Sequence, residues 1–210
     1  MRHSNTVKIL TLVCFVTLGI IAVGCTAKSP SVEFYSLSPM DIAENELPGH
    51  ATDPELAVGV GPVLFPAELE RPQIVTRAST NKFHVAQFHH WGSPLQKNFS
   101  KTLAENLSIL LGTDNVAVFP WQQHFKPTFR VVLDIGQFDG IIGDNASLNA
   151  RWTITDSSGK KALLVKKSNL QQPTAGTGYE NLVSAQNKLV ATLSQEIARQ
   201  IKMFYSKPAK

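Results

Sequence analysis

The longest apolar run of the chain lies at its N-terminus. Ile9 to Val23 is interrupted only by two threonines and one glycine, and it follows Arg2, His3 and Lys8 without an acidic residue between them. A membrane-spanning helix needs roughly 20 apolar residues. The run from Ile9 to Val23 is shorter than that, and its basic flank and small residues near the end are typical of a signal peptide. The pattern therefore predicts a targeting segment ahead of the folded domain.

Most of the remaining chain alternates between apolar and polar residues. This alternation is typical of half-buried strands, and Gly, Pro, Asn, Asp and Ser mark the turns between them. Gly59, Gly61 and Pro62 interrupt one run, which implies a bulge or an edge position. Residues 79–81 predict a hairpin turn, as do residues 156–159. The strands are expected at 32–37, 56–65, 73–78, 82–88, 116–121, 128–138, 146–156 and 161–169.

Two segments have helical periodicity instead. The first carries an apolar face from Leu95 to Leu111, with Ser93 as the expected N-cap, Pro94 in the first turn and Gly112 as the C-terminal stop. The second runs from about residue 179 to 204. Strands in two groups, each followed by a long amphipathic helix, predict an α+β fold in which both helices pack on a mostly antiparallel sheet.

The targeting segment ends in Ala22-Val23-Gly24-Cys25. A cysteine directly after small residues resembles a bacterial lipobox, whose thiol receives a diacylglycerol and whose freed amine is then acylated. The commonest lipobox has Leu and then Ala or Ser where Ala22 and Val23 stand. Two or more acyl chains anchor a protein stably, so Cys25 is the expected lipidation site. An uncleaved anchor, or secretion with Cys25 as a free thiol, is the alternative.

These features divide the chain into four parts. We expect a lipoprotein signal peptide at 1–24, a lipidated tether at 25–31, a single periplasmic domain at 32–206 and a polar tail at 207–210. Thr26 follows the cysteine in place of an inner-membrane retention signal Asp, which favours the periplasmic face of the outer membrane. Cys14 leaves with the signal, so the mature chain has no second cysteine for a disulfide.

Charge changes this picture little. Removing Arg2 and Lys8 with the signal lowers the formal net charge from +4 to +2. The remaining bases are dispersed and are not interleaved with aromatic residues, so nucleic acid is not an expected partner. Lysines at 160, 161, 166 and 167 flank a short apolar run. This pattern favours a solvated hairpin over a lipid-headgroup patch. The segment 40–55 carries five acids and no base, and it is expected to be a loop.

No motif for catalysis or metal binding is apparent. Neighbouring residues on a strand point to opposite faces, so His89 and His90 cannot share an ion without a turn, and His84 and His124 have no nearby carboxylate in the sequence. No G-x-S-x-G motif occurs. We expect no catalytic residue, no metal and no cofactor. Acidic residues near strand ends and turns are expected to be structural, and they are Asp134, Asp139, Asp144 and Asp156.

Bulky aromatic residues cluster around the first helix in the sequence. Core packing accounts for most such residues, whereas those left exposed would mark a surface for a partner or a lipid. The residues are Phe88, Trp91, Phe119, Trp121, Phe125 and Phe129.

Two sequence blocks are similar to a known family. The block at 58–77 reads VGVGPVLFPAELERPQIVTR, and the block at 88–107 reads FHHWGSPLQKNFSKTLAENL, followed by Phe119-Pro120-Trp121. These blocks, with Phe138-Asp139-Gly140 and Ala150-Arg151-Trp152, resemble the ABC-type transport auxiliary lipoproteins, in particular the PqiC-like (YmbA) branch.

The resemblance implies a non-enzymatic lipoprotein of the outer membrane that supports envelope integrity. Such proteins accompany MCE-domain proteins, which span the periplasm and carry lipids between membranes, together with a membrane permease. The expected partners are therefore an MCE-domain protein, its permease and, through the anchor, the membrane. The alternative is an independent periplasmic protein that binds lipids or small amphiphiles. The sequence leaves the oligomeric state open.

Overall fold

The computed structural model describes residues 30–41 and 55–206. The chain divides into two units, 1–31 and 32–210, and the second contains every element described below. The expected signal peptide, Cys25, most of the acidic loop and the polar tail lie outside the described residues. Among the described helices, none is both long enough and apolar enough to cross a membrane.

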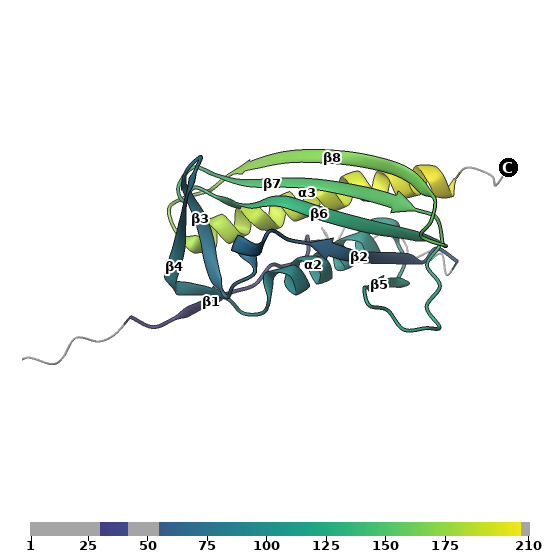
Figure 1. Ribbon diagram of the computed structural model, residues 1–210, viewed down its shortest axis with the longest axis horizontal. Coiled ribbons are helices and arrows are strands. Elements are labelled where there is room, and N and C mark those ends of the chain that lie inside the picture. Colours follow the sequence, from purple (N-terminus) through teal and green to yellow (C-terminus); the bar gives the residue numbers. More distant parts are fainter. Residues whose placement is uncertain (1–29, 42–54, 207–210) are drawn as a thin grey trace, which may run out of the picture. The chain divides into compact units, whose positions relative to one another are not determined.

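The larger sheet has five strands in the order β5-β2-β6-β7-β8. Strands β6, β7 and β8 form an antiparallel meander, while β2 runs parallel to both β5 and β6. In Figure 1 the three long strands of the meander lie side by side. The bounds are β2 Val58–Leu64, β5 Val116–Val118, β6 Phe129–Gly140, β7 Asn145–Thr155 and β8 Ala162–Pro173.

The smaller sheet has three strands in the order β1-β4-β3. Strands β3 (Gln73–Ser79) and β4 (Lys82–Trp91) form the expected antiparallel hairpin, and the short β1 (Glu33–Tyr35) pairs with β4 in parallel. Strand β4 is longer than the sequence pattern predicts, because it continues beyond Phe88 to Trp91. The prediction of an α+β fold with mostly antiparallel strands is confirmed.

Both predicted helices are present, as α2 (Leu95–Leu111) and α3 (Tyr179–Tyr205). Gly112 ends α2 as expected, in the left-handed conformation with φ 65°, and its N–H is bonded to the Ser108 and Ile109 carbonyls. The expected Ser93 cap is wrong. Pro94 occupies the N-cap position, and no side chain caps the helix there.

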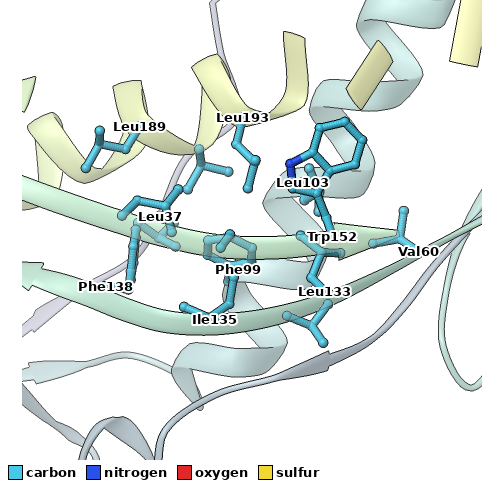
Figure 2. Packing of buried hydrophobic residues seen from close by; sticks show 14 of the residues in the cluster. Leu37, Val60, Phe99, Leu103, Leu133, Ile135, Phe138, Trp152, Leu189 and Leu193 are labelled. Carbon is cyan, nitrogen blue, oxygen red and sulfur yellow. The ribbon is translucent and has the colours of Figure 1, made fainter. Parts of the chain in front are cut away.

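The core lies between these two helices and the larger sheet (Figure 2). Phe99 and Leu103 from α2 and Leu193 from α3 are fully buried against Leu133 and Ile135 of β6. Trp152 of β7 is also buried, and its indole N–H donates to the Ser168 hydroxyl at 2.9 Å. Alternate residues of β6 to β8 therefore face the helices, and the intervening residues lie on the opposite face of the sheet.

Strand β2 contains the bulge that its glycines and proline imply. Its register with β6 shifts between Val60 and Val63. The alternative of an edge position is wrong, because β2 lies between β5 and β6. The strand expected at 116–121 ends early, at Val118, and the following residues turn back over β2.

Candidate functional site

An apolar groove lies where the end of β2 meets the junction between β4 and α2. Its volume is about 520 Å³. The short 3-10 helix η2 (Ala67–Leu69) forms one side. Leu69, Trp91 and Leu95 are buried in its floor. The remaining apolar lining is Phe65, Pro72 and Pro94.

Backbone hydrogen bonds fix the walls of this groove. The Trp91 N–H donates to the Pro72 carbonyl at 2.6 Å, which ties the end of β4 to the segment after η2. The Gly92 N–H donates to the Tyr35 carbonyl at 2.8 Å. From the first turn of α2, the Gln96 amide donates to the Val63 carbonyl. Hydrogen bonds between several elements therefore fix the shape of the groove, which preorganises it for a ligand.

The rim of the groove carries two exposed charges, Glu70 and Arg71, and two polar side chains, Ser93 and Gln96. No histidine, lysine or cysteine lies among the lining residues. A largely apolar hollow with a few polar groups at its edge is suited to binding an apolar side chain or chain segment. The groove is thus a candidate docking site.

The groove also joins the two sequence blocks described above. All of its lining residues lie within 58–77 or 88–107. Residues 65–72 come from the first block and residues 91–96 from the second. The residues that carry the family resemblance thus meet in one surface feature.

The Phe119-Pro120-Trp121 motif has a different place in the structure. A Cβ atom at Gly59 would lie 2.8 Å from the Trp121 ring, and one at Gly61 would lie 2.9 Å from the Phe119 Cβ. The two glycines of β2 therefore make room for both aromatic residues. We call residues 119–127 the aromatic loop. Phe119 is 50% exposed within it, while Trp121 and Phe125 are half-buried and their rings contact each other.

The histidines do not converge. Across residues 30–41 and 55–206, no group of three or more His, Cys, Asp or Glu side chains is placed to hold a metal ion. His89 stacks on Tyr179 of α3, with ring centroids 3.9 Å apart, and its Nδ1 lies 2.9 Å from the Tyr35 hydroxyl. That hydroxyl donates to Glu33 at 2.6 Å. Burial and this acidic neighbour raise the pKa of Tyr35 to about 12.

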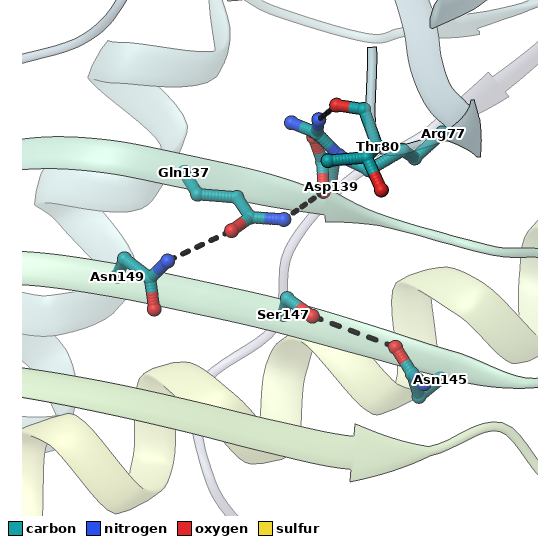
Figure 3. Close-up of polar contacts among 7 residues, drawn as sticks. All are labelled: Arg77, Thr80, Gln137, Asp139, Asn145, Ser147 and Asn149. Atoms are coloured by element: carbon teal, nitrogen blue, oxygen red, sulfur yellow. Dashed lines mark hydrogen bonds and ion pairs between the residues drawn. The ribbon is translucent and has the colours of Figure 1, made fainter. Parts of the chain in front are cut away.

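Asp139 is a buried acidic residue that links the two sheets (Figure 3). It is 2% exposed and its Oδ2 accepts two hydrogen bonds from Arg77 of β3, at 2.7 and 3.1 Å. Its Oδ1 accepts one from the side-chain amide of Gln137, and the Oε1 of that amide in turn accepts one from the Asn149 side chain. The ion pair thus fastens the smaller sheet to the larger one.

Asp156 stabilises the turn between β7 and β8. The Ser158 hydroxyl donates to it at 2.7 Å. This bond and the backbone N–H groups of the turn lower the pKa of the Asp156 carboxyl. The turn role expected for Asp156 is therefore seen in the structure. The pairing of Arg77 with Asp139 was not predicted, because 62 residues separate them and alternation gives only the face on which each lies.

A family model of the ABC-type transport auxiliary lipoprotein component matches residues 35–198. One solved structure, of an uncharacterised protein, is 20% identical with a TM-score of 0.66, covering 82% of this chain and 99% of that one. Another, a Xanthomonas campestris protein of the DUF330 family, is 12% identical with a TM-score of 0.63, covering 80% and 93%. At this identity the two structures confirm the fold alone.

No curated protein matches the chain significantly. The family model nevertheless spans both sequence blocks, the groove, the aromatic loop and most of α3. Lipoproteins of such a family act in the cell envelope from a lipid anchor, as auxiliary components of a transporter. Because this match covers more than half of the chain, the chain belongs to the ABC-type transport auxiliary lipoprotein family.

Proposed function

We propose that this protein is a non-enzymatic auxiliary subunit of a system that moves lipids between the two membranes of the envelope. Its groove docks the periplasm-spanning MCE-domain protein of that system. The family supports the role of transport auxiliary. The specific MCE partner is supported by the resemblance of the blocks at 58–77 and 88–107 to the PqiC-like branch.

The anchor belongs to the same proposal. Residues 1–24 are a signal peptide, and Cys25 carries the diacylglycerol and the N-acyl chain. Residues 25–31 tether the domain at 32–206 to the inner leaflet of the outer membrane. From this position the domain receives a partner that reaches across the periplasm from the inner membrane.

The observation that carries the docking role is the composition of the groove. Its floor is apolar and its lining comes entirely from the two sequence blocks. Burying apolar surface contributes about 25 cal/mol per Å², so a few inserted apolar side chains would supply several kcal/mol. The exposed Glu70 and Arg71 at the rim would then orient the partner more than they hold it.

The test is copurification from membranes. Full-length tagged protein, solubilised in a mild detergent, is expected to recover the MCE-domain protein and its permease. Pro94→Glu places a carboxylate at the mouth of the groove, and an acidic residue at a helix N-terminus is favourable for α2. We expect this variant to fold normally and to recover at least tenfold less of the partner.

The matched control is Lys188→Glu on α3, which also introduces a glutamate at an exposed helical position but lies outside the groove. Its recovery of the partner is expected to equal that of the wild type. If the wild type recovers no MCE-domain protein, the proposed partnership is wrong. If Pro94→Glu recovers as much partner as Lys188→Glu, the groove is not the docking site.

The anchor has its own test. Mass spectrometry of the mature N-terminus is expected to find Cys25 with both acyl modifications, and Cys25→Ser is expected to leave the membrane fraction. An unmodified Cys25 in the mature protein would contradict the proposed location, without bearing on the groove.

A further inference from the structure

A second hollow, far from the groove along the sheet, has a different chemistry. Its volume is about 490 Å³. It lies between the aromatic loop and the turn that joins β7 to β8. Two cations, two aromatic rings and two serines line it, and no carboxylate is among the lining residues. We call it the basic hollow, and its principal residues are Trp121, Phe125, Lys126, Arg130, Ser157 and Ser158.

Arg130 is built into this hollow rather than free in solvent. Its Nη2 donates to the Ser157 carbonyl at 2.7 Å, and its guanidinium carbon lies 5.6 Å from the centroid of the Trp121 ring. On the side of the turn, a Cβ atom at Gly159 would lie 2.7 Å from Nη1. The glycine therefore makes room for the guanidinium, and the turn and the tryptophan hold it in place.

The guanidinium nevertheless has unused hydrogen-bonding capacity. A guanidinium has five N–H donors, and the Nε of Arg130 is buried without a hydrogen-bond partner. Among the described residues the three ion pairs join other side chains, so Arg130 has no carboxylate partner. A partly buried arginine without a counterion is costly, and an anionic ligand would relieve that cost.

The surrounding charges favour the same class of ligand. Lys126 is exposed at the hollow, and Lys160 and Lys161 are exposed in the adjoining turn. The acid of this turn, Asp156, is engaged by the Ser158 hydroxyl and by the Lys161 N–H at 3.4 Å. The carboxylate thus serves the turn itself, and the cations remain available to an anion.

We propose that the basic hollow binds a phosphate group, carried either by a phospholipid headgroup or by free phosphate. The guanidinium of Arg130 presents a fixed planar fork of donors, the geometry that matches phosphate oxygens, and the Lys126 ammonium adds a mobile positive charge. Trp121 and Phe125 offer apolar contact beside the anion, which a glycerol or acyl portion of a lipid would use. This site is separate from the docking groove and does not depend on the identity of the docked partner.

The experiment measures binding of defined probes to the full-length protein in a neutral detergent. The probes are inorganic phosphate, dihexanoyl-phosphatidylglycerol below its critical micelle concentration, and dihexanoyl-phosphatidylcholine as a zwitterionic comparison. Calorimetry gives the affinity. Tryptophan fluorescence gives a local signal, because Trp121 lines the hollow whereas Trp91 and Trp152 are buried elsewhere.

Two variants change the two cationic side chains separately. Lys126→Gln changes an exposed side chain and is expected to leave the fold intact while weakening binding severalfold. Arg130→Lys keeps the positive charge but loses the planar fork, and it is expected to weaken binding about tenfold. Lys101→Gln, an exposed lysine of α2, is the matched control and is expected to bind as the wild type does.

Saturable binding of phosphatidylglycerol or phosphate that both variants weaken supports the proposal. Tighter binding of phosphatidylglycerol than of inorganic phosphate assigns the site to a lipid headgroup, and the reverse order assigns it to free phosphate. The proposal is overturned if neither anionic probe binds, or if Lys126→Gln and Arg130→Lys bind as well as Lys101→Gln. Failure of the MCE copurification would leave these results unaffected.

Discussion

The ion pair between Arg77 and Asp139 gives the sharpest test of how the two sheets are held together. Asp139→Asn replaces a carboxylate by an amide of nearly the same size, so packing changes little. It removes the negative charge that accepts two hydrogen bonds from Arg77 and one from Gln137. The guanidinium then remains between the sheets without its counterion.

The expected cost follows from the burial of the two partners. Removing one member of a buried ion pair costs about 3–5 kcal/mol. The Asp139 side chain is 3% exposed, but that of Arg77 is 24% exposed. Water can therefore solvate part of the guanidinium that has lost its counterion. We therefore expect Asp139→Asn to lower the free energy of unfolding by about 2–3 kcal/mol. This is a large part of the 5–15 kcal/mol typical of folded proteins.

Urea unfolding of the full-length protein, followed by circular dichroism, measures this change. Asp134→Asn is the matched control, since Asp134 is an exposed residue of the same strand, and its effect is expected to stay within about 0.5 kcal/mol. A double-mutant cycle with Arg77→Met isolates the pair and is expected to give a coupling energy above about 1 kcal/mol. A coupling near zero, or equal effects of Asp139→Asn and Asp134→Asn, would refute the reasoning.

Three further changes have expected outcomes. Burial opposes ionisation of Glu196, but hydrogen bonds from Lys166 and Ser168 lower the pKa of its carboxyl. Its contribution to stability is therefore present above the ordinary pKa and is lost as the pH falls. Urea midpoints between pH 3 and 7 should fall less steeply in Glu196→Gln, and equal slopes would contradict this. Gln186 is fully buried and its amide lacks a partner among the described residues, so Gln186→Met should raise the unfolding free energy by about 1 kcal/mol, and a loss would indicate an unseen partner. Gly59→Ala should displace Trp121 and shift tryptophan emission to the red, whereas an unchanged spectrum would contradict the close packing.

Periodicity was sufficient to predict the long elements of the fold. The alternation in 128–138 and 146–156 and the apolar stripe of 95–111 each correspond to an observed strand or helix. These segments are long and have one buried face, so the pattern repeats often enough to be read. Short features were less predictable. Ser93 is a favourable cap residue by type, yet the helix begins after Pro94, where no side chain caps it.

The candidate sites could be predicted from the sequence less well than the fold. The residues that line the groove lie in the two sequence blocks, but these blocks showed only a family resemblance, and the pattern could not show that 65–72 and 91–96 meet. The sequence also could not show why position 59 is a glycine, because the Trp121 ring that packs against it is 62 residues away in the chain. Distant contacts of this kind depend on how the elements pack, which local alternation does not encode.

Strand β2 connects the two proposed sites and explains why they should act independently. Its start lies under the aromatic loop, and its end leads through Phe65 into the groove. Phe65 lies six positions after Gly59, which is at most about 20 Å of extended chain. Changes further apart than about 10 Å with no shared partner are usually additive. Pro94→Glu should therefore reduce docking without weakening phosphate binding, and Lys126→Gln should weaken phosphate binding without reducing docking. If either variant impaired both activities equally, the groove and the basic hollow would have to be parts of a single coupled surface.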